Sequence, residues 1–412
     1  MIPGGRLLLL AVAAGFLLRA GFGLGYWVGK PLTHDEQEYL ALAASLADGR
    51  GFTYPPAGPG QPEPERFGRA PVYPLFLAGV LAAARATGAD ALTAIKLAQA
   101  AVGALGIWLI ARLAGRVAGS RAGLMAAWMA ALYPPLIWTP AYVFSETLYM
   151  ALALGHVVAT AGLLAGRDGD RSARLLWSGL LGGLAALTRP AHLFYLMLLG
   201  LHLARRRRLA AAGLLLAGAL AAIAPWTARN AREHGRFVLI ASEGGITFWT
   251  GNHPLSRGEG DMAANPGIKL DNRRLRAEHP GLTPEQLEPV YYREALDAIG
   301  RDPVWWAGLL ARKAFYTWVP IGPSYTLHST RYLAATVVSY GVLLAAGVAG
   351  ALVVIRHGRW PAALGLLLGS AALVCVVFFP QERFRIPVID PTLIVLAASG
   401  LALARPAPKT SA

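Results

Sequence analysis

Residues 5–39 read GRLLLLAVAAGFLLRAGFGLGYWVGKPLTHDEQEY, an apolar run that leads directly into a cluster of acids. The apolar part is long enough to cross a bilayer as one helix, which takes roughly 20 residues. Asp35, Glu36 and Glu38 follow within four positions, in a chain that has few acids. The junction therefore predicts a first membrane helix followed by carboxylates at the membrane boundary.

The composition of the whole chain agrees with a membrane protein. Of its 412 residues, 55% are hydrophobic and only 15% are charged, and the mean hydropathy is +0.45. The net charge of +15 does not indicate a nucleic-acid partner, because several of the basic residues form short clusters between apolar runs, as topology signals do. The single cysteine, Cys375, excludes an intramolecular disulfide.

Apolar windows continue along the chain and predict an all-α polytopic bundle of about ten transmembrane helices. The windows cover residues 6–28, 92–111, 122–138, 141–165, 173–188, 191–204, 209–226, 332–355, 361–379 and 391–404. A further stretch, residues 71–88, has two prolines in its first turn and Arg85 near its end. Whether this stretch spans the membrane or lies along it decides the orientation of everything that follows.

The distribution of arginines in short loops indicates that residues 71–88 lie along the membrane and do not span it. With residues 71–88 in the interface, twelve arginines fall on one side and three on the other. The larger set is Arg112, Arg116, Arg121, Arg167, Arg171, Arg174, Arg205, Arg206, Arg207, Arg208, Arg356 and Arg359. We therefore expect a multi-pass protein of a bacterial-type inner (plasma) membrane, with both termini cytoplasmic and residues 30–90, 134–140 and 227–331 outside.

Three regions follow from this topology. Residues 1–226 form an N-terminal transmembrane module with a first external loop at 29–91, residues 227–331 form a long external loop, and residues 332–412 hold the C-terminal transmembrane helices. The long loop is expected to contain short interfacial helices, because bare loops of that length are uncommon. One begins after Thr283 as N-cap, with Pro284 at its first position, and another covers 303–319.

Acids at the external boundary are the first candidates for chemistry. Asp35 and Glu36 are expected at the start of a short helix, and Glu38 is expected to face water. Within LYPPLIWTPAYVFSETLYMAL, residues 132–152, two prolines close one helix and Pro140 opens the next. This predicts Glu146 nearly two turns inside a helix, in apolar surroundings where an ionisable residue is costly.

Arginines on the same side are the second candidates, since a guanidinium group suits bidentate phosphate contacts. The turn FFPQERFRIPVIDP, residues 378–391, carries Glu382, Arg383 and Arg385. Arg66 and Arg69 precede the interfacial stretch, and Arg189 lies at an external helix end. We expect these residues, with Tyr39, to bind substrate.

Other classes of site lack support in the sequence. The histidines show no zinc-binding spacing, no glycine-rich loop has the context of a phosphate cradle, and no nucleophile elbow is present. His156, His192 and His202 are expected to be ordinary helix residues. No cofactor is predicted with certainty, although a divalent metal ion is compatible with the acids.

Several stretches, taken in order, resemble the polytopic GT-C glycosyltransferases of family 39 type, which include protein O-mannosyltransferases and lipid A aminoarabinose transferases. They are THDEQEY (33–39), RFGRAPVYPLFLAG (66–79), the segment 111–152 with its SETLYMAL end, GLAALTRP (183–190), PWTARNAREHGRFVLIASEGGITFWTGNHP (225–254) and ERFRIPVIDP (382–391). The resemblance implies a GT-C-like bundle with residues 71–88 as a juxtamembrane helix.

The resemblance also implies a function and roles for individual residues. Such enzymes take a sugar from a polyprenyl-phosphate carrier and pass it to an extracytoplasmic lipid, glycan or protein acceptor, usually with inversion. Asp35 would be the first-loop catalytic acid, Glu146 the second acid, and Arg69 the contact to the lipid phosphate. Glu36 would support Asp35, and the partners would also include membrane lipids. No inserted accessory domain or large soluble C-terminal domain is expected, so the acceptor cannot be inferred.

Two other functions stay open. A secondary transporter would carry internal repeats and paired ionisable residues near the bilayer midplane, and Arg19, Lys96 and His156 form no such pair. A ligase or polymerase of the O-antigen type would use the same external loops but a diphosphate-linked donor.

Overall fold

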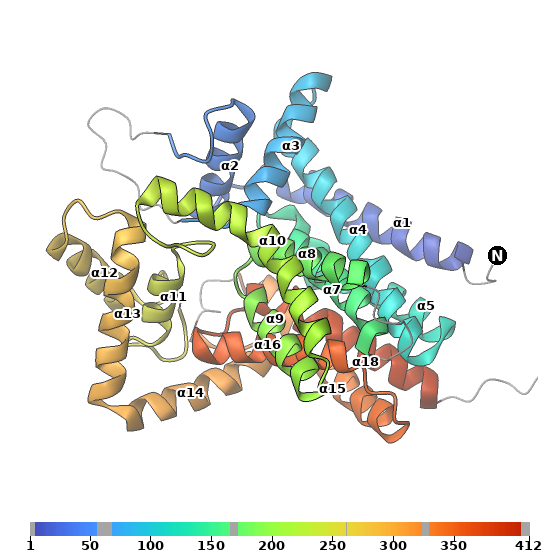
Figure 1. Ribbon diagram of the computed structural model, residues 1–412. Coiled ribbons are helices and arrows are strands. Elements are labelled where there is room, and N and C mark those ends of the chain that lie inside the picture. The colour runs from blue at the N-terminus through green and yellow to red at the C-terminus, as the bar shows by residue number, and fades with distance from the viewer. Residues whose placement is uncertain (1–4, 56–67, 165–171, 261, 324–328, 405–412) are drawn as a thin grey trace, which may run out of the picture.

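The computed structural model describes residues 5–55, 68–164, 172–260, 262–323 and 329–404 (Figure 1). Within these ranges the regular structure is entirely helical, with no β-strand. The first half contains α1 (Gly5–Phe22), η1 (Gly23–Trp27), α2 (His34–Ala47), α3 (Val72–Thr87), α4 (Ala91–Ala118), α5 (Ser120–Leu132), α6 (Pro134–Trp138), η2 (Thr139–Ala141), α7 (Glu146–Leu164), α8 (Ser172–Thr188) and α9 (His192–Arg205). The second half contains α10 (Leu209–His234), α11 (Gly244–Gly251), α12 (Pro266–Glu278), α13 (Pro284–Arg301), α14 (Pro303–Trp318), α15 (Thr330–Arg356), α16 (Ala362–Val377), α17 (Glu382–Arg385) and α18 (Ile389–Ala404).

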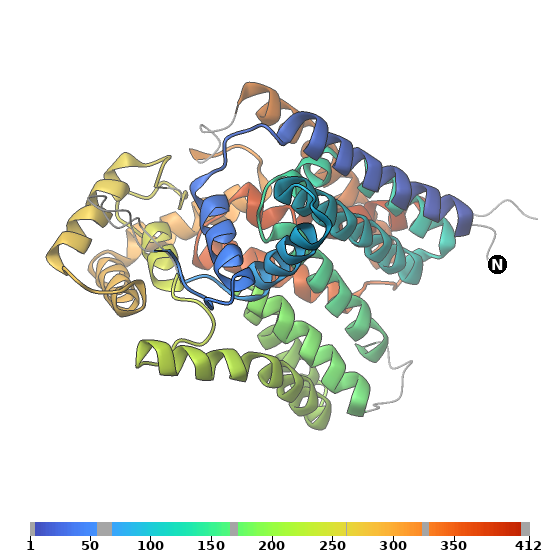
Figure 2. The same cartoon turned by 90° about the horizontal axis from the view of Figure 1, so that it is seen from above.

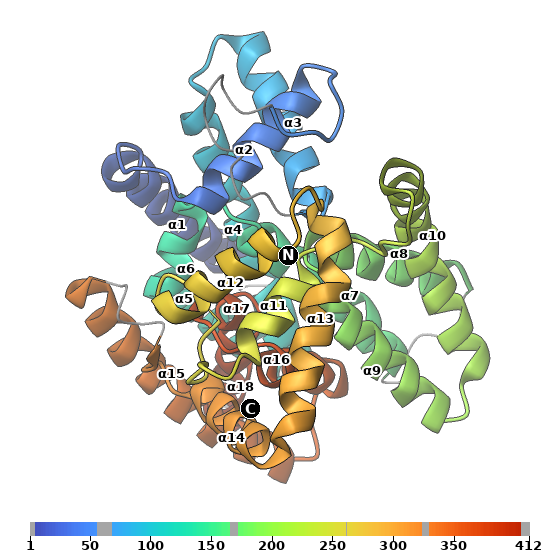
Figure 3. The same ribbon diagram turned by 90° about the vertical axis from the view of Figure 1, so that its left-hand side faces the viewer.

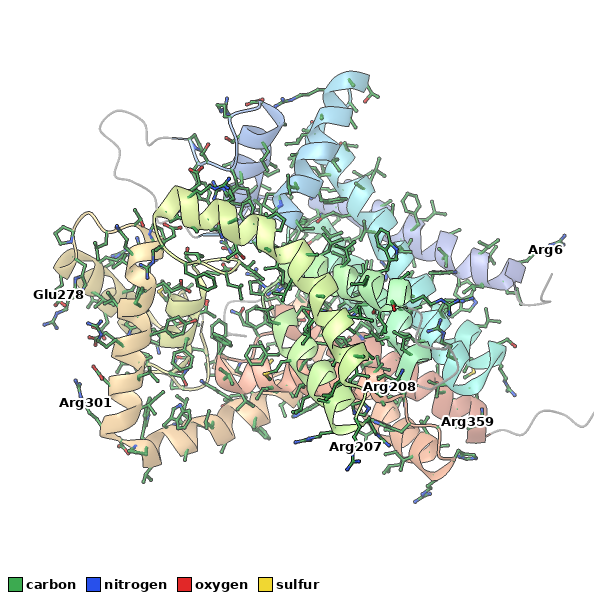
Figure 4. The ribbon with its side chains drawn as sticks, in the orientation of Figure 1. Arg6, Arg207, Arg208, Glu278, Arg301 and Arg359 are labelled. Carbon is green, nitrogen blue, oxygen red and sulfur yellow. The ribbon has the colours of Figure 1, made fainter. Side chains whose placement is uncertain are left out.

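The helices confirm a polytopic membrane protein. In the described part of the chain, five helical segments are long and apolar enough to cross a membrane: α1 with η1, α4, α7, α10 and α15. The helices α3, α16 and α18 are shorter but also apolar. Each of the ten windows predicted from the sequence contains helix. Figure 4 shows that Glu278 of α12 and Arg301 of α13 lie at one end of the molecule, away from four labelled arginines, Arg6, Arg207, Arg208 and Arg359.

Small residues let the long helices pack closely, which is how helices associate where lipid removes the hydrophobic driving force between them. The pair α8 and α10 is the clearest case. A Cβ added to Gly179 would lie 1.9 Å from the carbonyl oxygen of Leu215, and one added to Gly218 would lie 2.2 Å from that of Leu176. No larger side chain fits at either position, so the two backbones touch along this seam.

The helices α11, α12 and α13 form a separate group over one end of the bundle (Figures 1 and 3). They share a small core that includes Trp249 of α11, Ile268 of α12 and Tyr291 of α13. Seen from above, α2 lies between this group and the long helices (Figure 2). A second small core, with Tyr39, Ala43, Tyr73 and Leu77, holds α2 against α3.

The predicted starts of α2, α13 and α14 are confirmed, and one predicted start is wrong. Thr283 caps α13 in a capping box with Gln286, and Thr33 caps α2 in a capping box with Glu36. Pro140, however, lies in the short η2 turn, and α7 begins only at Glu146 itself. Residues 142–145, between η2 and α7, are not helical. Glu146 therefore lies in the first turn of its helix and not two turns inside it.

Candidate functional site

The start of α2 fixes the position of Asp35. The carboxylate of Glu36 accepts hydrogen bonds from the backbone N–H of Thr33 and from the N–H of Val143, both at 2.8 Å. Glu36 thus caps its own helix and ties it to the chain segment before α7. This leaves Asp35, the preceding residue, partly exposed and facing a cavity.

Arg69, just before α3, contacts three acids, two of α2 and one that lies far along the chain before α11. Its Nη2 donates to Asp35 Oδ1 at 2.7 Å, its Nε to Glu38 Oε2 at 3.0 Å and its Nη1 to Glu243 Oε2 at 3.1 Å. The guanidinium also lies 5.0 Å from the ring centroid of Tyr39. Arg69 is only 6% exposed, so these contacts fix its side chain in one position.

The prediction that Glu38 faces water is wrong. The Glu38 side chain is buried and accepts a hydrogen bond from Arg69. Helical spacing gives the direction of Glu38 relative to α2 alone, whereas Arg69 approaches that face from a separate segment.

Arg383 of α17 links Asp35 to Glu146. Its Nη1 donates to Asp35 Oδ2 and its Nε to Glu146 Oε1, each at 2.7 Å. Arg189, after α8, reaches the same Oε1 of Glu146 at 2.7 Å. The charges therefore alternate without a break in the order Glu243, Arg69, Asp35, Arg383, Glu146, Arg189.

This alternation determines the ionisation of Asp35. Burial disfavours its charged form, but the nearby charges of Arg69 and Arg383 and their hydrogen bonds outweigh burial. Together they hold the pKa of the Asp35 carboxyl well below its usual range. Asp35 is thus ionised at neutral pH, yet its affinity for a proton is low while both arginines stay in place.

A cavity of about 1530 Å³ opens beside this set of charges. Its polar lining includes Asp35, Tyr39, Arg69, Arg189, Glu243 and Arg383. Apolar side chains from α9, α16 and the segment after it also line it, including Leu193, Phe194, Val374 and Phe378. One chamber therefore offers guanidinium and carboxylate groups next to an apolar surface, as an amphipathic ligand requires.

The remaining predicted residues lie elsewhere. Glu146 does not line the cavity; it lies behind the wall and holds the two arginines. Glu382 accepts a hydrogen bond from Thr336, and Arg385 is buried against Asp390 and the ring of Tyr340. Arg66 lies outside the described residues.

Two of the unpredicted residues of the cavity wall matter most for its chemistry, Glu243 and Tyr149. Glu243 precedes α11 and lies within the resembling stretch 225–254, but nothing there singled it out, and its contact with Arg69 is what reveals it. Tyr149 follows Glu146 by three positions on α7 and had no signal beyond that spacing.

The donor set does not favour a metal ion. Among the described residues, no three His, Cys, Asp or Glu side chains are grouped so that they could hold one. Between Asp35 and Glu146 the guanidinium of Arg383 provides the positive charge that the two acids share. A divalent metal remains a prediction of the sequence, and the chemistry proposed below does not depend on one.

Comparison with solved structures identifies the fold. No protein-family profile and no curated protein matches the chain. The archaeal oligosaccharyltransferase AglB from Archaeoglobus fulgidus, solved with an inhibitory peptide and a dolichol-phosphate, matches 96% of this chain with a TM-score of 0.58 and 17% identity. The same enzyme solved with zinc and sulfate matches 97% of this chain with a TM-score of 0.57 and 15% identity.

The match covers only part of those proteins. The chain spans about half of their length, 50% in the first structure and 49% in the second. ArnT from Cupriavidus metallidurans, bound to undecaprenyl phosphate, aligns over 97% of this chain and 77% of its own at 16% identity, but its TM-score of 0.42 is too low to support an argument. The oligosaccharyltransferase structures suffice for the fold: the chain has the GT-C fold.

Proposed function

We propose that the protein is a membrane glycosyltransferase that moves a sugar from a polyprenyl-phosphate-linked donor to an extracytoplasmic lipid, glycan or protein acceptor. The observation that carries the proposal is the position of Arg383 between Asp35 and Glu146, on the wall of a large cavity that also has an apolar lining. A lipid-linked sugar phosphate needs both surfaces, one for its phosphate and one for its hydrocarbon chain.

The arginines supply the phosphate site. Arg69, Arg189 and Arg383 all line the cavity, and each is paired with a carboxylate. A donor phosphate competes with these carboxylates for the guanidinium groups, since charge-assisted bonds to phosphate are strong and geometrically well matched. Arg383 is the most exposed of the three, at 30% against 14% for Arg189 and 6% for Arg69. We therefore expect it to turn to the phosphate first.

The release of Arg383 prepares Asp35 to act as a base. With one of its two arginines engaged by phosphate, the Asp35 carboxylate loses part of the stabilisation that keeps its pKa low, and its proton affinity rises. The acceptor hydroxyl oxygen then bonds to the anomeric carbon while the bond from that carbon to the phosphate oxygen breaks. The hydroxyl proton passes to Asp35, and the phosphate leaves with the electron pair, stabilised by the arginines. Attack opposite the leaving group inverts the sugar.

The decisive experiment is sugar transfer by the purified protein. Synthetic polyprenyl-monophosphate and polyprenyl-diphosphate sugars are offered with an envelope lipid and glycan extract, and products are identified by mass spectrometry. We expect transfer from the monophosphate donor, abolished by Asp35→Asn. The matched control is Asp48→Asn, at the other end of α2, where the side chain pairs with Arg50 and Arg85 away from the cavity.

The other outcomes replace the proposal. Transfer only from diphosphate donors would favour the ligase or polymerase alternative. Normal turnover by Asp35→Asn would remove Asp35 from the chemistry. Absence of transfer from every donor, combined with substrate movement across proteoliposomes, would favour the transporter.

A further inference from the structure

A chain of polar side chains runs from the cavity into the helix bundle between α7 and α9. Tyr149 lines the cavity, and its hydroxyl lies 3.4 Å from Nδ1 of His192. Nε2 of His192 lies 2.9 Å from Nδ1 of His156. Both histidines are completely buried. Such a chain is costly in apolar surroundings unless its hydrogen bonds are arranged in one consistent order.

The far end of the chain determines that order. Nε2 of His156 is buried and has no hydrogen-bond partner among the described residues. A buried N–H without an acceptor is rarer than an acceptor that stays unused, so the proton of neutral His156 belongs on Nδ1. His156 then donates to Nε2 of His192, since a neutral imidazole has one donor and one acceptor.

The same reasoning gives the direction of the hydrogen bond between His192 and Tyr149. With Nε2 of His192 accepting, the proton of this ring lies on Nδ1 and is donated to the hydroxyl oxygen of Tyr149. The hydroxyl hydrogen of Tyr149 is consequently not used toward His192. It is left to donate to another acceptor, and the cavity is the space that Tyr149 lines.

The position of Tyr149 indicates what that acceptor is. Ser145 lies four residues before Tyr149 and also lines the cavity. Its hydroxyl accepts a hydrogen bond from Nη1 of Arg189 at 3.5 Å. Leu193 and Phe194 of α9 are apolar cavity residues. Tyr149 therefore lies where the guanidinium groups meet the apolar wall, at the level where the head and the chain of a bound lipid would join.

We propose that the Tyr149 hydroxyl donates a hydrogen bond to a phosphate oxygen of the lipid carrier, and that His192 and His156 are positioning residues that orient this hydroxyl. The inference rests on the proposed function, because it names a contact of the same donor. By orienting the Tyr149 hydroxyl as a donor, the two histidines favour a ligand that places a strong oxygen acceptor beside it.

The test is binding of undecaprenyl phosphate, without sugar, to the purified full-length protein, with undecaprenol as the uncharged comparison. Tyr149→Phe keeps the ring and removes the hydroxyl. We expect roughly 10-fold to 100-fold weaker binding of the phosphate, the range for losing a hydrogen bond to a charged group, and unchanged binding of the alcohol. Tyr195→Phe is the matched control: its hydroxyl contacts Thr160 in the same helix pair but does not line the cavity.

A second pair of variants tests the histidines. His192→Asn retains an N–H donor near the position of Nδ1, whereas His192→Leu retains none. We expect the first to keep most of the phosphate affinity and the second to match Tyr149→Phe; in transfer assays the loss should appear in KM and hardly in kcat. Equal phosphate affinity of Tyr149→Phe and wild type overturns the inference while leaving the glycosyltransferase intact. Failure of the wild type to bind undecaprenyl phosphate overturns the proposed function itself.

Discussion

Nη1 of Arg383 lies 2.7 Å from Oδ2 of Asp35, although 348 positions separate the two residues in the sequence. This contact joins the start of α2 to the turn before α18, and thereby the first and last parts of the bundle. Under the proposed mechanism it would also oppose catalysis in the resting protein, because it lowers the pKa of the Asp35 carboxyl. The ion pair is therefore expected to be both a structural link and the feature that donor binding must break.

A double-mutant cycle measures this link. Arg383→Ala leaves Asp35 and Glu146 each with one arginine fewer, so the variant should be clearly destabilised. Adding Asp35→Asn removes one of the two carboxylates that lost an arginine and should recover part of the loss, with a coupling of about 0.5–3 kcal/mol. Thermal unfolding of the four proteins in one detergent gives the cycle. Strict additivity of the two single effects would mean that the contact has no energetic role.

Arg69 should be irreplaceable by lysine. It uses three different nitrogen atoms on three acids, Asp35, Glu38 and Glu243, and an ammonium group cannot reproduce that planar arrangement. Arg69→Lys should therefore lose nearly as much donor affinity as Arg69→Ala, even though the charge is kept. Donor binding and acceptor binding should be measured separately, because the loss is expected on the donor side.

The matched control for this prediction is Arg85→Lys. Arg85 forms a single pair with Asp48 and is largely exposed, and such surface pairs contribute at most about 1 kcal/mol. It should behave as wild type. If Arg69→Lys also behaves as wild type, charge alone suffices at that position and the forked geometry is irrelevant.

The orientation in the membrane can be tested with single thiols. The native Cys375 is buried, so Cys375→Ser gives a background without reactive thiols. Glu278→Cys on α12 should react with an impermeant maleimide from outside intact cells, and Arg206→Cys should react only after the membrane is opened. The wild-type protein, labelled in parallel, shows whether the native Cys375 reacts. The reverse labelling pattern would invert the topology and place the proposed site in the cytoplasm.

The sequence predicted the charged members of the site better than their contacts. Asp35 was a candidate because acids placed against a membrane boundary are few, and Arg69, Arg189 and Arg383 because guanidinium groups on the external side suit phosphate contacts. Glu243 could not be found in the same way, because it lies within the long stretch 227–331 that was expected outside the membrane, away from any predicted membrane boundary. The order of pairing is a tertiary property, set by segments as far apart as 68–71 and 382–385.

Glu36 and Glu146 show a second limit. Glu36 was predicted as catalytic because it adjoins Asp35 at a helix start, and Glu146 because an ionisable residue in apolar surroundings is costly. In the structure the carboxylate of Glu36 accepts hydrogen bonds from the N–H groups of Thr33 and Val143. The carboxylate of Glu146 pairs with two arginines behind the cavity wall. Their catalytic roles remain untested predictions, and we expect Glu36 to act through the position of α2 and Glu146 through the position of Arg383.

Lys313 gives the stability of the protein a distinct dependence on pH. It is completely buried on α14, where its ammonium group donates to Asn252 Oδ1 at 2.9 Å. Burial lowers the pKa of Lys313 to about 7, against about 10.4 for an unfolded chain. Between these values the unfolded chain holds a proton that the folded chain has lost. Stability therefore rises with pH in this window, by at most about 1.4 kcal/mol per pH unit, and the gain disappears below the folded pKa.

Replacing Lys313 by methionine removes the titrating group and keeps an unbranched side chain. Between pH 7 and pH 10, the Tm of Lys313→Met should gain less, or lose more, than that of wild type. Lys30→Met is the control, because Lys30 is exposed and its ammonium group lies 4.7 Å from the ring centroid of Tyr26. If Lys313→Met and wild type have the same slope of Tm against pH, Lys313 keeps its proton in the folded protein, and the amide of Asn252 must then stabilise a buried cation without help from any acid.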